Sequence, residues 1–226
     1  MKDLVVPKPA LTFLKTLAKN NNRDWFQEHK PKFTALSGEM KQFFSGLDEK
    51  LKVHDDIEKM KIFRIYRDVR FSKDKSPYKT QFSCSYSRRG EHLRGGYYIR
   101  IAPGETFLGA GFFNPNKEDL FRIRKELELD ASDFVAVVED APFSKVWGKL
   151  QGETVKTAPK GFDKEHEHIS YIRHKQFYFT RTFTDTEVCA PDFMEVVDQS
   201  FQAIRPYFNL MSDVLTTNLN GESLLG

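Results

Sequence analysis

Cysteine is scarce in this chain, and long apolar segments are missing. The 226 residues include only two cysteines, Cys84 and Cys189, too few for the disulfide framework of a small secreted domain. No apolar run approaches the roughly 20 residues that cross a bilayer. Residues 1–7 lack the apolar segment and cleavage site of a secretory signal. We therefore expect a cytoplasmic protein with reduced thiols and no membrane association.

The motifs of several common enzyme classes are missing as well. The chain has no G-x-S-x-G elbow, no Walker loop, no G-x-G-x-x-G and no paired cysteines of the zinc type, so serine hydrolases, classical nucleotide folds and cysteine zinc sites are unsupported. Potential metal ligands are densest at residues 165–168 (Glu-His-Glu-His), without H-E-x-x-H spacing. We expect a solvated segment there and no metal site, and the sequence names no cofactor.

Phenylalanine, in contrast, is abundant. The chain contains 21 Phe residues, which predicts an aromatic-rich core. Its length is sufficient for one sizeable domain, and we find neither an internal repeat nor a low-complexity linker. We therefore expect a single domain over residues 1–226, with its core at about 9–219.

Apolar residues recur at helical spacing near both ends of the chain. The pattern predicts a helix over residues 9–17 and another that begins after Asn22, which can act as its N-cap. Pro31 is expected to break or kink this helix, leaving a long helix over residues 32–53. Helices are also expected after Asn116 and over residues 191–204, where Pro206 marks an interruption.

The middle of the chain alternates with a period of two residues instead. Strands are predicted over 62–71, 81–86, 97–101, 106–113 and 176–183. Their mostly short connections favour antiparallel pairing. The fold class is therefore α+β, an antiparallel sheet of about five strands with N- and C-terminal helices packed against it. The glycines of Gly109-Ala110-Gly111 indicate a bulge or a close approach by another backbone or a ligand.

Positive charge is concentrated in one stretch, residues 61–79. This stretch has a formal charge of +5, whereas the whole chain carries only +3. Arginine's planar fork suits a phosphate or carboxylate, and nearby lysines add point charge. The sequence therefore predicts a site for a small phosphate- or carboxylate-bearing ligand. Its candidate residues are Arg64, Tyr66, Arg67, Asp68, Arg70, Lys73, Lys75, Tyr78 and Lys79.

Each side-chain type has an expected role in this site. Arg64 and Arg70 would make bidentate contacts with the anion, and Asp68 would orient an arginine. Tyr66 and Tyr78 would donate hydrogen bonds or stack against the ligand.

The same residues are compatible with three other functions. A phosphoester-processing enzyme would need an acid or base, for which Asp68, Asp74 and His174 are the candidates. A nucleic-acid binder would use the stretch as part of an extended basic surface. In a structural or partner-docking protein, the arginines would pair internally with acids such as Asp68. The sequence decides neither between these functions nor the oligomeric state.

Four stretches together resemble an uncharacterised bacterial family, domain of unknown function 2461. They are residues 20–26 (Asn-Asn-Asn-Arg-Asp-Trp-Phe), the basic stretch from Phe63 to Lys79, Gly95-Gly96-Tyr97-Tyr98 with Phe107-Leu108-Gly109-Ala110-Gly111, and Lys175-Gln176-Phe177. The resemblance spans about residues 9–210, with Ala110 standing where the family pattern tends to have a glycine. It implies a single domain and supplies no activity, cofactor or catalytic residue.

Overall fold

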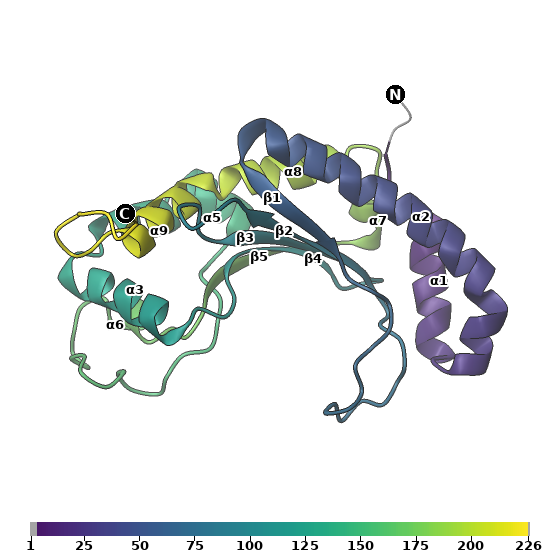
Figure 1. Cartoon of the computed structure of the whole chain (residues 1–226), viewed down its shortest axis with the longest axis horizontal. Coiled ribbons are helices and arrows are strands. Elements are labelled where there is room, and N and C mark those ends of the chain that lie inside the picture. The colour runs from purple at the N-terminus through teal and green to yellow at the C-terminus, as the bar shows by residue number, and fades with distance from the viewer. Residues whose placement is uncertain (1–3, 226) are drawn as a thin grey trace. The chain divides into compact units, whose positions relative to one another are not determined.

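Helices lie towards both ends of the chain and a five-stranded sheet lies in its middle (Figure 1). The computed structural model describes residues 4–225, so residues 1–3 of the segment searched for a secretory signal lie outside it. The helices are α1 (Lys8–Lys19), α2 (Arg23–His54), α3 (Lys117–Leu129), α4 (Ser132–Val138), α5 (Ala141–Trp147), α6 (Ile169–Ile172), α7 (Asp185–Val188), α8 (Phe193–Ala203) and α9 (Arg205–Thr216). The strands are β1 (Ile57–Ile62), β2 (Phe82–Arg88), β3 (Gly96–Ile101), β4 (Thr106–Phe112) and β5 (Phe177–Phe183).

The strands follow one another in the sheet in the order in which they occur in the chain, β1-β2-β3-β4-β5. Such an order is that of an antiparallel meander. The α+β class with about five antiparallel strands is therefore confirmed. The connection from β4 to β5 is long and contains helices α3 to α6.

The first strand lies earlier in the chain than its alternation predicted. It covers Ile57–Ile62, and residues 63–81 form an irregular loop instead of the strand expected over 62–71. Aspartates in the loop bind its backbone: Asp68 Oδ1 accepts from the Arg70 N–H at 3.2 Å, and Asp74 Oδ1 accepts from the Ser76 N–H at 2.9 Å. These side-chain bonds compete with a strand ladder. Strand β1 was not predicted because Ile57 is its only buried residue, so neither of its faces is consistently apolar. This composition is typical of a charged edge strand.

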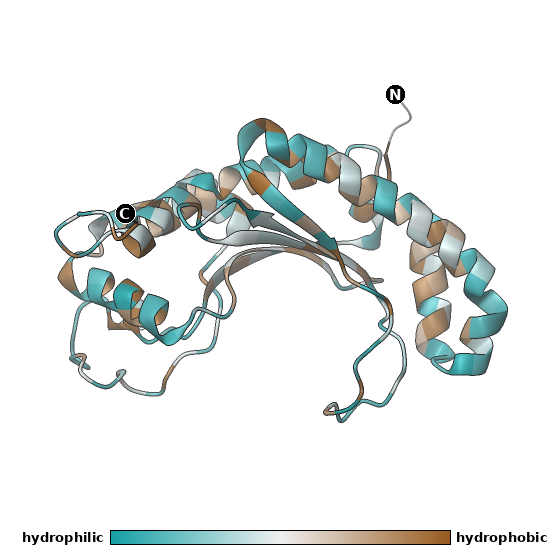
Figure 2. Cartoon of the chain, in the orientation of Figure 1, coloured by the Kyte–Doolittle hydropathy of each residue, from teal (hydrophilic) through white to brown (hydrophobic). Residues whose placement is uncertain are grey.

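Helix α2 is continuous through Pro31, so the predicted break at this residue is wrong, whereas a kink there stays a prediction. Asn22 caps the helix as expected, since its side chain accepts a hydrogen bond from the Trp25 N–H at 3.0 Å. Figure 2 colours much of α2 teal, in keeping with its many exposed charged residues. The buried residues of the helix, which include Phe43, Phe44 and Leu47, lie on one stripe.

The chain divides into two compact units. Unit 1 consists of the described residues up to Tyr86, Tyr98–Leu108 and Thr182–Gln199. In it α1 packs against α2, with the rings of Phe13 and Trp25 5.8 Å apart. The buried Tyr86 hydroxyl donates a 3.0 Å bond to the Phe44 carbonyl, which links the sheet to α2.

Unit 2 consists of Ser87–Tyr97, Gly109–Arg181 and the described residues from Ser200 onward. Its helix α9 packs against α3 and α4, and the Tyr207 hydroxyl on α9 donates to the Phe177 carbonyl at 3.0 Å. Gly111 has φ +131°, and a Cβ there would lie 2.5 Å from the Phe177 carbonyl oxygen. The glycine is needed because the β5 backbone approaches closely. A single domain over residues 1–226 stays a prediction.

Candidate anion-binding site

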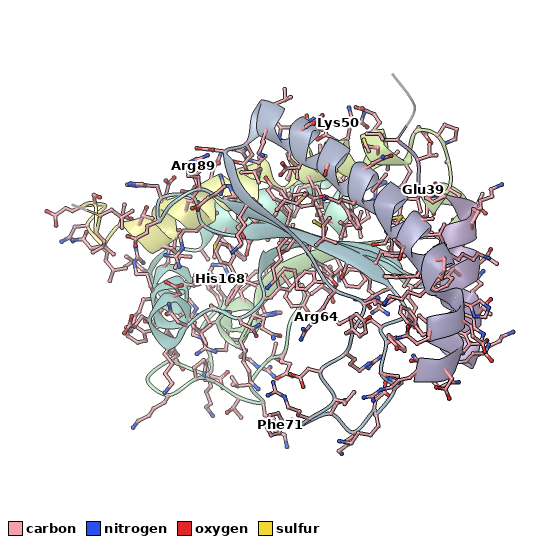
Figure 3. All side chains as sticks on the ribbon, turned by 45° about the vertical axis from the view of Figure 1, so that its right-hand side comes forward. Glu39, Lys50, Arg64, Phe71, Arg89 and His168 are labelled. Carbon is pink, nitrogen blue, oxygen red and sulfur yellow. The ribbon has the colours of Figure 1, made fainter. Side chains whose placement is uncertain are left out.

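The loop of residues 63–81, called the basic loop below, begins where β1 ends. A bridge between Tyr66 and Tyr78 closes its stem. The Arg67 N–H donates to the Pro77 carbonyl at 2.9 Å, and the Lys79 N–H donates to the Ile65 carbonyl at 2.7 Å. Figure 3 shows Arg64 near the sheet and Phe71 at the far end of the loop. The stem thus fixes the residues on both sides of the bridge, and the tip extends into solvent, where Phe71 is 95% exposed.

Tyr78 anchors the stem to the helices. The residue is 2% exposed, and its ring stacks on Phe26 of α2, with centroids 3.9 Å apart. Its backbone is held by the Asn21 side chain, which accepts from the Tyr78 N–H at 3.1 Å and donates to its carbonyl at 2.9 Å. This role of Asn21 was not predicted from the sequence, although the run of three asparagines marked the segment. The Tyr78 ring faces the core rather than a ligand, whereas the Tyr66 side chain is exposed.

At the tip of the loop, several predicted ligand-binding side chains bind each other. Arg70 makes a bidentate pair with Asp68, at 3.0 and 2.7 Å, and this hydrogen bonding is the main cause of a lowered pKa at Asp68. Lys75 Nζ donates to the Val69 carbonyl at 2.9 Å. Arg67 pairs with Asp74 at 2.7 Å. Arg70 and Lys75 are therefore less available to an external anion than the sequence pattern suggested.

A second group of cations gathers around Lys79 at the base of the loop. Burial lowers the Lys79 pKa, and repulsion from Arg64, Arg67 and Lys61 lowers it further. In the part of the chain that the structure describes, neither Lys79 nor Arg64 forms an ion pair with an acid. We call Lys61, Arg64, Arg67 and Lys79 the basic cluster. Arg64, Arg67 and Lys79 were predicted as ligand-binding residues, whereas Lys61 was counted in the basic stretch but not among the candidates. Lys73, also predicted, is exposed near the tip.

Aromatic side chains lie next to the basic cluster. The ammonium groups of Lys61 and Lys79 are 5.2 and 5.5 Å from the ring centroid of Phe63. The Phe63 ring lies 6.0 Å from Tyr98 on β3, and Tyr98 lies 5.7 Å from Phe107 on β4. We call Phe63, Tyr98 and Phe107 the aromatic row. The β3 alternation, with Tyr97, Ile99 and Ile101 buried on the opposite face, was the sequence signal for it.

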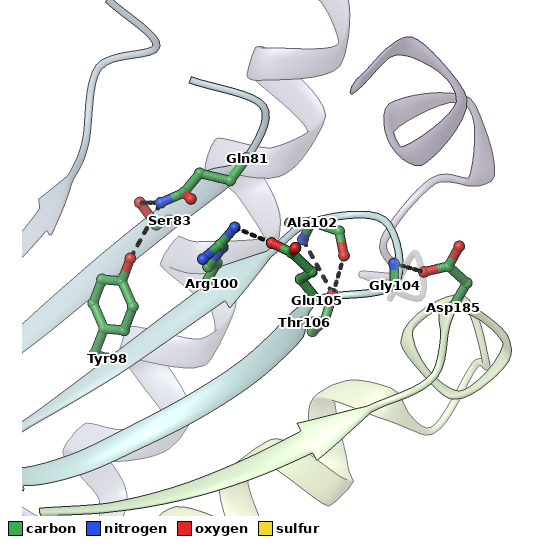
Figure 4. Close-up of polar contacts among 9 residues, drawn as sticks. All are labelled: Gln81, Ser83, Tyr98, Arg100, Ala102, Gly104, Glu105, Thr106 and Asp185. Atoms are coloured by element: carbon green, nitrogen blue, oxygen red, sulfur yellow. Dashed lines mark hydrogen bonds and ion pairs between the residues drawn. The ribbon is translucent and has the colours of Figure 1, made fainter. Parts of the chain in front are cut away.

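Polar groups border this row. Gln81 Nε2 donates to the Tyr98 hydroxyl oxygen at 3.3 Å, and Arg100 forms an ion pair with Glu105 (Figure 4). The Arg100 guanidinium also lies 5.9 Å from the Phe107 centroid. The face of the sheet in unit 1 therefore combines π surfaces, hydrogen-bonding groups and cations.

The acid and base candidates occupy different environments. Asp68 and Asp74 are paired with arginines in the basic loop. His174 belongs to unit 2, where it lines a cavity of about 620 Å³ with Tyr171, Glu139 and other residues. Burial lowers the pKa of His174, and the Tyr171 hydroxyl donates to Glu139 at 2.7 Å. The basic loop itself therefore offers carboxylates that are already engaged.

The remaining reactive side chains have structural contacts. His166 Nε2 lies 3.1 Å from the Glu128 carbonyl oxygen. Among residues 4–225, no three His, Cys, Asp or Glu side chains are grouped so that they could hold a metal ion. Cys84 is fully buried, and burial raises the pKa of its thiol to about 12, which is unsuited to a nucleophile. Within the same range, no helix has both the length and the apolar character needed to span a membrane.

This α+β fold, with its basic loop beside an aromatic sheet face, can be compared with known proteins. A family model described as a conserved hypothetical protein, DUF2461, matches residues 9–209. The chain belongs to this family. Searches of curated proteins and of solved structures found no match.

Proposed function

We propose that the basic cluster binds a small phosphate- or carboxylate-bearing ligand. The observation that carries this proposal is the position of Lys79, which is half-buried and repelled by three cations. Crowding of like charges is unfavourable, and an anion placed among them removes the repulsion and adds attraction. Lys79 and Arg64 supply donors that form no ion pair with an acid of the described residues.

The geometry favours a phosphate over a single carboxylate. Several cations within Coulomb range of one another suit a ligand that carries more than one negative charge. A phosphate also offers three acceptor oxygens, which can satisfy donors from separate side chains. Arg67 would reach the ligand while it is held by Asp74, and the Arg70–Asp68 pair would support the loop.

The test is a calorimetric titration of the full chain with inorganic phosphate, inorganic triphosphate and citrate. We expect triphosphate to bind most tightly. Replacing Lys79 by Gln should weaken binding about tenfold, since it removes a charge-assisted contact. Lys73→Gln is the matched control, because Lys73 is exposed at the loop tip, and it should leave the affinity unchanged.

Two outcomes would contradict the proposal. One is that none of the three anions binds. The other is equal weakening by Lys79→Gln and Lys73→Gln, which would indicate a diffuse charge effect in place of a site. Loss of stability in Arg64→Ala without any anion binding would favour the structural or partner-docking alternative, because Arg64 would then act within the fold.

A further inference from the structure

The aromatic row continues the basic cluster onto the sheet. Phe63 belongs to both: it is 5.2 and 5.5 Å from the two lysine ammonium groups and 6.0 Å from Tyr98. Phe107 extends the row to the next strand, β4. All three rings are partly exposed. A ligand held by the cations would therefore lie within reach of aromatic surface.

The hydrogen-bonding groups beside the row are not fully used. The Tyr98 oxygen accepts from Gln81 Nε2, which leaves the hydroxyl hydrogen of Tyr98 to be donated. Within residues 4–225, neither that hydrogen nor the Gln81 side-chain carbonyl has a partner. A donor and an acceptor thus stand together at the row. The edge of a nucleobase presents the same combination of groups.

We infer that the ligand of the basic cluster is a nucleoside phosphate, with its phosphates at the cluster and its base at the aromatic row. The inference rests on the proposed function, and it adds the chemical class of the ligand. Proteins that bind single-stranded nucleic acids stack bases on aromatic side chains and contact phosphates with cations, and the same contacts suit a single nucleotide. Dicarboxylates and inorganic phosphates have no ring that could stack on the aromatic row.

A purely structural role for the row predicts a different result. The rings contact each other at tilted or edge-on angles, a geometry that itself stabilises aromatic packing. If the rings only pack, replacing one changes stability and leaves ligand preference as it was. Ligand preference is therefore the quantity to measure.

The experiment compares adenosine triphosphate with inorganic triphosphate, whose phosphate chains match, by calorimetry on the full chain. The nucleotide should bind at least about tenfold more tightly, as expected for one stacked base. Phe107→Leu keeps apolar volume and removes the π face, so it should abolish this preference and leave the affinity for triphosphate unchanged. Tyr98→Phe keeps the ring and should lose only part of the preference. Lys79→Gln should weaken both ligands.

The matched control is Phe121→Leu, because Phe121 is an exposed ring of unit 2 (55% exposed); it should change neither affinity. If both ligands bind equally, or if glucose 6-phosphate binds more tightly than adenosine monophosphate, the inference is wrong and the proposed function survives. If neither triphosphate binds, the inference and the proposed function both fail.

A base joined to phosphate occurs in a free nucleotide and also in a nucleic-acid strand. Binding of an oligothymidylate of eight nucleotides tests whether a strand is the source. Much tighter binding of the oligomer than of thymidine triphosphate, lost in Phe107→Leu, would assign the site to the base of a strand.

Discussion

The run Asn20-Asn21-Asn22 gives each side chain a different hydrogen-bonding task. Asn20 donates to the Thr16 carbonyl at the end of α1, at 3.0 Å. Asn22 caps the start of α2. Asn21 binds both backbone groups of Tyr78 in the basic loop. One short connection therefore ends a helix, begins the next and positions the loop that carries the candidate site.

Asn21→Ala should lower the free energy of unfolding by about 1–3 kcal/mol, because it leaves the N–H and C=O of a buried residue without partners. Urea denaturation measures this change. The same variant should weaken triphosphate binding, since the stem that positions Lys79 loosens. The control is Asn20→Ala. It removes a hydrogen bond that is exposed to solvent, so it should lower the free energy of unfolding by less. Equal effects of the two substitutions would show that Asn21 does not hold the loop.

At the scale of elements, helix α2 shows what tertiary context adds to local signals. Pro31 lacks an N–H and usually ends or kinks a helix, yet α2 covers 32 residues with Pro31 inside it. Burial of Phe26 on one side of the proline and of Leu36, Met40 and Phe43 on the other holds both halves in the core. The helical spacing of these residues was visible in the sequence. The sequence did not show that their burial would outweigh the helix-breaking effect of Pro31.

We expect Pro31→Ala to raise the free energy of unfolding by about 1–3 kcal/mol, because alanine restores the missing hydrogen bond and has a far higher helix propensity. Pro31 is exposed, so the substitution removes little packing. Urea denaturation checks the expectation, with Lys30→Ala, also exposed, as the neutral control. A destabilised Pro31→Ala variant would mean that the fold requires the geometry imposed by the proline.

The strands show the converse limit of sequence reasoning. β3 was predictable, because Tyr97, Ile99 and Ile101 alternate with polar or half-exposed residues and are buried. The sequence of the basic loop also alternates with a period of two residues. Its polar residues, however, bond to each other within the loop, as Arg70 does with Asp68, and do not belong to a strand. The positive charge of the candidate site was therefore visible. The choice of Arg64 and Lys79 over Arg70 and Lys75 required the three-dimensional contacts.

On the scale of the whole molecule, the charge distribution bears on whether the proposed site would take a small ligand or a nucleic acid. Residues 61–79 carry +5 in a chain of net charge +3, so the remaining residues sum to −2. The +5 already includes the negative charges of Asp68 and Asp74, which pair with Arg70 and Arg67 within the loop. The net positive charge is therefore concentrated in the stretch that contains the basic cluster.

Ionic strength should therefore weaken ligand binding only moderately. Between about 50 and 200 mM salt, we expect the affinity for inorganic triphosphate to fall by about tenfold or less, whereas a protein that makes about 6–10 phosphate contacts along a nucleic acid loses roughly 10³–10⁵. The measurement is a series of calorimetric titrations in potassium chloride. Lys79→Gln should make the dependence shallower, because one cation fewer faces the anion, and Lys73→Gln should not change it. The contrary outcome is an affinity that falls with salt as steeply as for a nucleic-acid binder, with a dependence reduced equally by Lys79→Gln and Lys73→Gln. The basic loop would then act as one extended charged surface, and the basic cluster would have no separate role.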